Sequence, residues 1–71
     1  MGFETKMIPE LEQLVQDRTH QRVKSLNIAL DGGRIVLCGV AESFHLKQLA
    51  QHGILDVMPK VRIVNNIVVQ G

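Results

Sequence analysis

The alternation of apolar and polar positions is most regular in residues 26–40, where it predicts a β-hairpin. Three apolar residues recur at every second position, which is the period of a strand with one buried side. These residues are Leu26, Ile28 and Leu30. A run rich in β-branched residues, Arg34–Val40, follows Gly32 and Gly33. Because glycine adopts the positive φ of a two-residue hairpin loop without steric cost, we place the tip of the hairpin at these two glycines.

The register of this hairpin follows from the same alternation. If Asp31 faces Arg34 across the loop, each further pair places its two side chains on one face of the sheet. The pairs expected are Leu30–Ile35, Ile28–Leu37 and Leu26–Gly39. The second strand of the hairpin is therefore expected to bury Ile35 and Leu37.

A helix is predicted on each side of the hairpin. Apolar residues at helical spacing predict a first helix over about Pro9–His20, with the proline in its first turn and a loose lead-in over Met1–Lys6. Ser43 is a suitable N-cap for a second helix over residues 44–57, and Pro59 stops that helix. The other apolar stretches predict strands. They are expected at Val23–Leu30, Arg34–Val40 and Val61–Val69.

These elements predict an α+β fold in the order α-β-β-α-β. One apolar stripe on each helix and one strongly apolar sheet face imply a two-layer α/β sandwich, in which two helices cover one face of a three-stranded mixed sheet. Residues 1–71 are expected to form a single domain with an ordered core over about residues 9–69. The order of the strands in the sheet is not predicted. Gly53 is expected to approach the sheet closely above Gly39, because neither residue carries a side chain.

Composition narrows the classes of function. The chain of 71 residues has no Trp or Tyr, which removes the commonest anchors of tight interfaces and of base-stacking platforms. Its net charge of +1 is too small for a binder that acts through bulk charge. No apolar run approaches the roughly 18 residues of a transmembrane helix, and no signal peptide is recognised. The expected location is therefore open: cytoplasmic, or periplasmic if the chain is excised from a longer precursor.

The residue types that carry chemistry form no predicted catalytic or metal site. Cys38, the single cysteine, is expected to face away from Ile35 and Leu37 as a small space-filling residue with no base to activate it. His45 and His52 are seven positions apart, whereas one helix binds zinc through positions i and i+4. We predict no catalytic residue, no metal and no cofactor, and we do not expect an enzyme.

Two groups of residues are candidate contact sites. The first group is basic and is expected to form one patch that contacts an anionic surface. Its members are Arg18, Arg22, Lys24, Lys60 and Arg62. The second group is apolar and is expected on the sheet face that the helices leave uncovered, as an association surface. Its members are Val36, Cys38, Val40, Val64 and Val68. Asn65 is expected on the buried face, as a structural amide that bonds a neighbouring loop.

Three segments of the sequence resemble the BON domain, a family named after bacterial osmotically inducible and nodulation proteins. The segments are DGGRIVLCGV, ESFHLKQLAQHGI and VRIVNNIVV. The positions that match the family pattern are Asp31, Gly32, Ile35, Leu37, Gly39, Ala41, Leu46, Lys47, Leu49, Ala50, Ile63, Asn65, Ile67 and Val69. The resemblance covers about Leu11–Val69. It departs from the family at residues 59–61, Pro-Lys-Val, where BON domains usually have Gly-Val.

The resemblance implies a small αββαβ module that associates with phospholipid membranes or other envelope components and has no enzymatic activity or cofactor. We therefore expect a non-catalytic binding or adaptor module, weakly associated with a phospholipid membrane surface, an envelope component or another protein domain. A weak homodimer through the open sheet face is a further expectation. The alternative is a regulatory protein-interaction module, or a nucleic-acid module that resembles K-homology domains. Nucleic acid is disfavoured because the sequence has no Gly-x-x-Gly loop between helices and no aromatic residue placed to stack bases.

Overall fold

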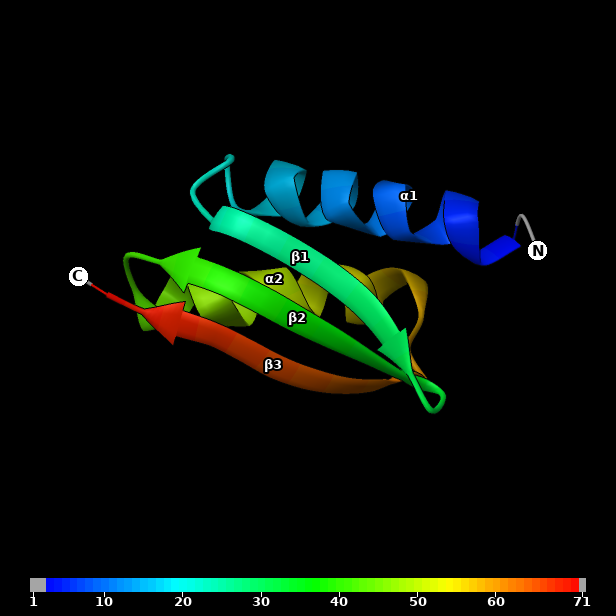
Figure 1. Cartoon of the computed structure of the whole chain (residues 1–71). Coiled ribbons are helices and arrows are strands. Elements are labelled where there is room, and N and C mark those ends of the chain that lie inside the picture. The colour runs from blue at the N-terminus through cyan, green and yellow to red at the C-terminus, as the bar shows by residue number, and fades with distance from the viewer. Residues whose placement is uncertain (1–2, 71) are drawn as a thin grey trace.

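The computed structural model describes residues 3–70, and the side chains of residues 7–70. Two helices and three strands follow one another in the order α-β-β-α-β (Figure 1), which confirms the predicted α+β class. The elements are α1 (Phe3–Arg18), β1 (Lys24–Asp31), β2 (Arg34–Ala41), α2 (Phe44–Val57) and β3 (Arg62–Val69).

The three strands form one mixed sheet in the order β1-β2-β3. The central strand β2 is antiparallel to β1 and parallel to β3. Both helices contribute to the same core as one face of this sheet, and α2 lies behind the strands in Figure 1. The other face of the sheet, which is turned toward the viewer in Figure 1, has no helix over it. The strand order was not predicted from the sequence. This order decides where the charged residues lie.

Most of the predicted hairpin register is confirmed. Asp31 pairs with Arg34, and the next pairs are Leu30–Ile35 and Ile28–Leu37. The expected pair Leu26–Gly39 is not a regular pair, because the register shifts between Lys24 and Asn27 and places both Ser25 and Leu26 opposite Gly39. β1 therefore carries one extra residue opposite Gly39, which makes a β-bulge and adds twist to the start of the strand. Ser25 lies in this bulge and has a φ of 55°, a conformation that the alternation of side chains does not reveal.

The predicted bounds of the first helix are wrong at both ends. α1 begins at Phe3, so the expected lead-in is helical over residues 3–6, while residues 1 and 2 lie outside the described part of the chain. Pro9 therefore lies inside α1 and not in its first turn. Proline removes one helical hydrogen bond, but residues 4, 6 and 7 (Glu, Lys and Met) are good helix formers and favour the additional turn.

α1 ends at Arg18, two residues before the predicted end, through a turn that contains no glycine. His20 and Gln21 have positive φ angles of 56° and 59°. The Gln21 N–H donates to the Gln16 carbonyl at 2.7 Å, as in the usual left-handed end of a helix. Neither His20 nor Gln21 is the Gly or Asn that usually marks such a helix end, so no local stop signal is visible here.

The predicted second helix is confirmed at both ends. α2 covers Phe44–Val57, and the Ser43 hydroxyl oxygen accepts a hydrogen bond from the Leu46 N–H at 3.2 Å. This N-cap satisfies one of the N–H groups that the first turn leaves without a helical partner. At the other end, the Met58 N–H donates to the Ile54 carbonyl at 2.8 Å, shortly before Pro59.

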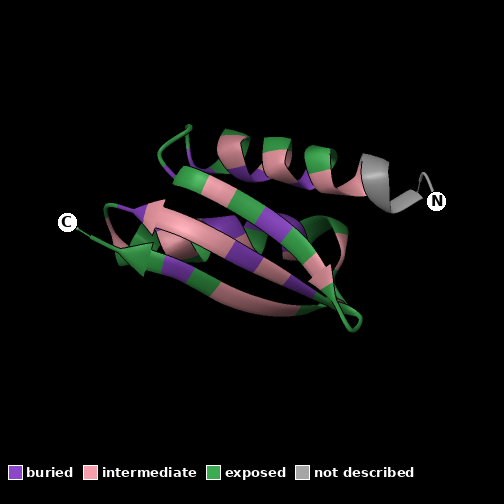
Figure 2. Ribbon diagram, viewed as in Figure 1, coloured by how far each residue is buried: buried purple, intermediate pink, exposed green. Residues whose placement is uncertain are grey.

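The core lies between the helices and the covered face of the sheet (Figure 2). Ile35 and Leu37 of β2, Val15 of α1 and Ile54 of α2 have no exposed surface. Burial of a side chain of this size contributes about 1.5–3 kcal/mol each. The full buried apolar set is Leu11, Val15, Val23, Ile28, Ile35, Leu37, Ala41, Leu46, Ala50, Ile54 and Ile67.

The expected approach of Gly53 to Gly39 is wrong. A Cβ at Gly53 would lie 3.0 Å from Cγ of Arg18, so this glycine allows α2 to approach α1. A Cβ at Gly39 would lie 3.0 Å from the Lys24 carbonyl oxygen and 3.0 Å from a methyl group of Val23. Gly39 has a φ of 154° and therefore accommodates the bulged start of β1.

These two glycines make a matched pair for a test of stability. We expect Gly39→Ala to lower the free energy of unfolding by about 1–3 kcal/mol, because backbone atoms of β1 cannot move away from the new methyl group. Gly53→Ala should change it much less, because the Arg18 side chain can shift and alanine gains about 1 kcal/mol of helix propensity. Urea denaturation of the two variants measures the difference. Equal destabilisation of the two would contradict this assignment of Gly39.

Candidate functional site

The face of the sheet that no helix covers is the first candidate site, and we call it the open face. The register places its side chains in rows that run across the three strands. From the hairpin end, the rows are Asp31–Arg34–Arg62, Ala29–Val36–Val64, Asn27–Cys38–Asn66 and Lys24–Val40–Val68. All five residues of the predicted apolar group lie on this face together. Val68 is the most exposed of them, at 52%.

The open face carries basic side chains at its two ends. Arg34 and Arg62 are neighbours at the hairpin end, where Arg34 Nη2 also contacts Asp31 Oδ2 at 3.2 Å. Lys24 is the neighbour of Val40 at the opposite end. Because a strand rises about 3.3 Å per residue, the two ends are about 20 Å apart along β2. The rows between them contain valine, alanine, asparagine and cysteine and no charged residue.

The single basic patch expected from the sequence does not form. Lys60 and Arg62 lie at the hairpin end, because β3 is parallel to β2 and the two strands start side by side. Lys24 lies at the other end, where β1 starts beside the end of β2. Arg18 belongs to α1 and forms an ion pair with Asp56 of α2.

Arg22 lies two residues before Lys24, at the same end of the sheet, and forms only a weak ion pair. Its Nη1 is 4.0 Å from Oε1 of Glu42, and both side chains are more than 60% exposed. An exposed pair at this distance contributes little to stability. The predicted basic group also omitted Arg34, which lies at the hairpin end of the open face. Its parity with Val36, two positions further along the strand, was the signal that placed it on the open face.

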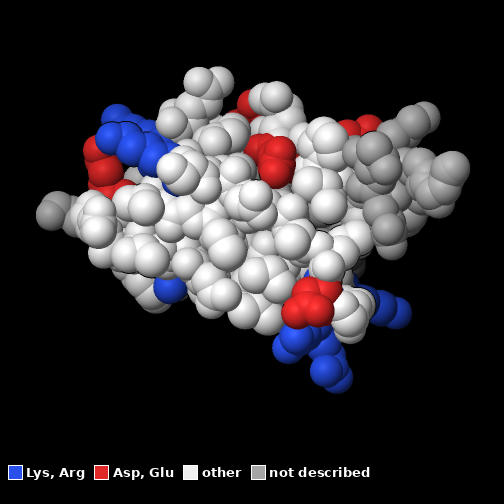
Figure 3. Space-filling model, viewed as in Figure 1, with Lys and Arg blue, Asp and Glu red and all other residues white. Residues whose placement is uncertain are grey.

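The charges are divided between the two layers of the fold. The strands and their connecting segments carry five basic residues against two acidic ones, Asp31 and Glu42. Between residues 7 and 57, the helices carry four acidic residues against two basic ones, Arg18 and Lys47. Figure 3 shows the Lys and Arg atoms gathered at the two ends of the molecule, with mainly uncharged atoms over the sheet between them. The sheet side is thus positive although the whole chain is almost neutral.

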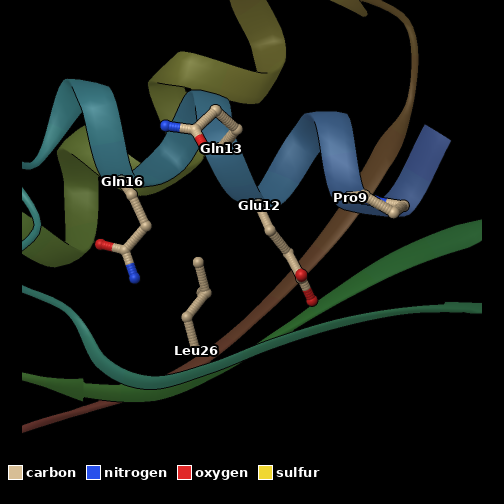
Figure 4. Close-up of a pocket in the computed structure, with 5 residues that line it drawn as sticks. All are labelled: Pro9, Glu12, Gln13, Gln16 and Leu26. Carbon is tan, nitrogen blue, oxygen red and sulfur yellow. The ribbon is translucent and has the colours of Figure 1, made fainter. Parts of the chain in front are cut away.

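A cleft between α1 and the outer edge of β1 is the second feature with polar groups (Figure 4). It is lined by Pro9, Glu12, Gln13, Gln16 and Leu26. The Ile28 N–H donates to Oε2 of Glu12 at 3.4 Å, and Nε2 of Gln16 donates to the Val23 carbonyl at 3.1 Å. Glu12 therefore attaches α1 to β1, and Gln16 attaches α1 to the residue just before β1. This cleft holds one carboxylate without a neighbouring nucleophile or second acid, so its geometry supports a structural role.

The described residues contain no group of three or more His, Cys, Asp and Glu side chains arranged to hold a metal ion. Cys38 is half-buried on the open face, and its neighbours in the row are Asn27 and Asn66, which offer no base. Within residues 3–70, no helix combines the length and the apolar character that crossing a membrane requires.

Asn65 is a structural amide, as expected, but it bonds a helix and not a loop. Its Nδ2 donates to the Lys47 carbonyl at 3.0 Å and to Oε1 of Gln51 at 3.2 Å. Its Oδ1 accepts from the Ile67 N–H at 3.2 Å. One side chain thus connects α2 to β3 and satisfies a backbone group of β3.

Asn65 and Asn66 are adjacent but face opposite sides of the sheet, which allows a direct comparison. We expect Asn65→Ala to lower the free energy of unfolding by about 1–3 kcal/mol, because it removes three hydrogen bonds in a partly buried position. Asn66→Ala, on the exposed side, should change it by about 0.5 kcal/mol or less. Chemical denaturation of both variants gives the two values. A larger loss for Asn66→Ala would mean that the inner and outer faces of β3 are wrongly assigned.

Comparisons with known proteins add no assignment to this geometry: no model of a protein family, no curated protein and no solved structure matches the chain.

Proposed function

We propose that the chain is a non-catalytic binding module that docks through its open face onto the anionic surface of a phospholipid membrane. The observation that carries this proposal is the composition of that face, in which uncharged rows rich in valine lie between basic side chains at both ends. An apolar centre with cationic side chains at both ends is complementary to a lipid surface, where anionic headgroups lie over the acyl chains.

The arrangement of charge favours a membrane over a small ligand. Lys24, Arg34 and Arg62 are spread along about 20 Å and do not converge on one point. A small anion would require converging donors, whereas a lipid surface offers negative charge over its whole area. The acidic residues of the helices lie in the other layer of the fold, which orients the molecule with its sheet toward the lipid.

The expected attachment is weak. Each basic residue close to an anionic leaflet contributes about 1 kcal/mol, and the contribution decreases as salt rises. The valines of a flat sheet face do not extend far into the acyl region, so they add a limited apolar contribution. The resemblance to BON domains, which associate with phospholipid membranes or envelope components, supports the same proposal and itself remains a proposal.

The nucleic-acid alternative has less support. Gly32 and Gly33 form the tip of the β1–β2 hairpin and do not connect two helices. The rows of the open face contain no aromatic residue on which a base could stack. Phe44 is 61% exposed, but it belongs to α2 in the helical layer.

Vesicle co-sedimentation with charge variants tests the proposal. The variant Lys24→Gln/Arg62→Gln removes one cation from each end of the open face, and we expect it to weaken partitioning onto anionic vesicles about tenfold or more at low salt. The matched control Arg18→Gln/Lys47→Gln removes the same charge from the helical layer and should weaken partitioning by only a few-fold.

Neutral vesicles and high salt complete this experiment. The parent chain should bind neutral vesicles weakly, and its binding to anionic vesicles should weaken as the salt concentration rises. Absence of binding to anionic vesicles at low salt would contradict the membrane proposal. Equal losses for the two double variants would show that bulk charge, and not the open face, is responsible.

A further inference from the structure

The two edges of the sheet differ in whether another element of the fold lies beside them. Beside the outer edge of β1 lies α1, whose Glu12 and Gln16 bond backbone groups of Ile28 and Val23. No described element lies beside the outer edge of β3, which Figure 1 shows along one side of the molecule. An uncovered edge strand presents unpaired N–H and C=O groups, and these can pair with another strand.

The backbone groups that β3 presents can be assigned. The Gln70 N–H donates to the Ala41 carbonyl at 2.8 Å, so the even-numbered backbone groups of β3 point toward β2. The odd-numbered groups, of Ile63, Asn65, Ile67 and Val69, therefore point outward. Within the described residues, the contact found for them is the one from the Ile67 N–H to Oδ1 of Asn65.

We propose that a second copy of this chain pairs with the free edge of β3 in antiparallel orientation, with Asn66 opposite Asn66 of the second copy. In this register residues 63–69 of one copy pair with residues 63–69 of the other, and most of these pairs join residues of the same character. On the open face, Val64 stands opposite Val68 of the second copy, and asparagine meets asparagine. On the covered face, Ile63 stands opposite Val69 of the second copy, and Asn65 stands opposite Ile67, which is the one kind of polar–apolar pair among residues 63–69. The exposed Val68 and Val69, at 52% and 40%, gain neighbours.

Other registers are less favourable. A shift of one residue would place the covered face of one copy beside the open face of the other. The alternative register centred on Asn65 would place Val64 opposite Asn66 and Arg62 opposite Val68 of the second copy. It therefore makes two kinds of polar–apolar pair, whereas the proposed register makes only the Asn65–Ile67 pair. In the proposed register Arg62 faces Gln70 of the second copy, and no two like charges are opposed.

The expected dimer is weak. It transfers the Ile67 N–H from Oδ1 of Asn65 to a backbone carbonyl of the second copy, so part of the gain is offset. One strand pair also buries less than the roughly 1,200–2,000 Å² of a standard interface, so the dimer is weak and forms as concentration rises. It produces one continuous sheet of six strands with an open face of twice the size. The inference goes beyond membrane docking and does not depend on it.

Disulfide cross-linking in lipid-free solution tests this pairing. In an antiparallel pair, Asn66 and its copy occupy a position without mutual hydrogen bonds, where the Cα atoms are about 4.5 Å apart and a disulfide fits. Cys38 is the neighbour of Asn66 in the sheet, so it is first replaced by serine. We expect Cys38→Ser/Asn66→Cys to form covalent dimers about tenfold faster than Cys38→Ser/Asn27→Cys. Asn27 flanks Cys38 on β1 and makes the control matched in face and row.

A third variant separates edge pairing from contact between faces. Val69→Pro, added to Cys38→Ser/Asn66→Cys, removes an outward N–H of β3 without removing a bond to β2. It should slow cross-linking by about tenfold while circular dichroism shows the same fold. Equal rates for the Asn66 and Asn27 variants, or cross-linking that Val69→Pro leaves unchanged, would overturn the proposal. A sedimentation coefficient of the parent that stays monomeric up to millimolar concentration would do the same.

Discussion

The opposite environments of the two sides of β2 organise the whole structure. Ile35 and Leu37 are fully buried beneath the helices, while Val36, Cys38 and Val40 alternate with them on the side that no helix covers. Because β2 is the central strand, its alternation also sets the faces of β1 and β3 through the backbone pairing. The core, the open face and the two basic ends of that face all follow from this one alternation.

Polar side chains attach the helical layer to the two outer strands. Glu12 connects α1 to the backbone of β1, Gln16 connects α1 to Val23 just before that strand, and Asn65 connects β3 to α2. These contacts differ in consequence, because α1 lies along the β1 edge whereas the β3 edge has no neighbouring element in the described part of the chain. The fold therefore leaves two features uncovered in the described part of the chain, the open face and the outer edge of β3.

Local patterns in the sequence predicted the parts of the structure that local physics determines. The hairpin tip, the inward set of Ile28 and Leu37, and the second helix with its Ser43 cap are confirmed. The split of the basic residues was not predictable, because it depends on β3 lying parallel to β2, and no local pattern encodes strand order. The bulge at Ser25 and the end of α1 at Arg18 were also missed, since both use positive φ angles at residues other than glycine. The open face was recognised from the sequence, but the basic residues at its two ends could be placed correctly only from the register of the strands.

The reactivity of Cys38 toward a small thiol reagent is the most direct test of the two-sided sheet. Cys38 lies on the central strand, and its side chain reaches solvent only if no other part of the molecule covers the open face. We expect labelling in the native state at a rate that does not change with denaturant well below the unfolding transition. A labelling rate that instead rises in proportion to the unfolding equilibrium constant would show that Cys38 is covered, and would contradict the assignment of the two faces.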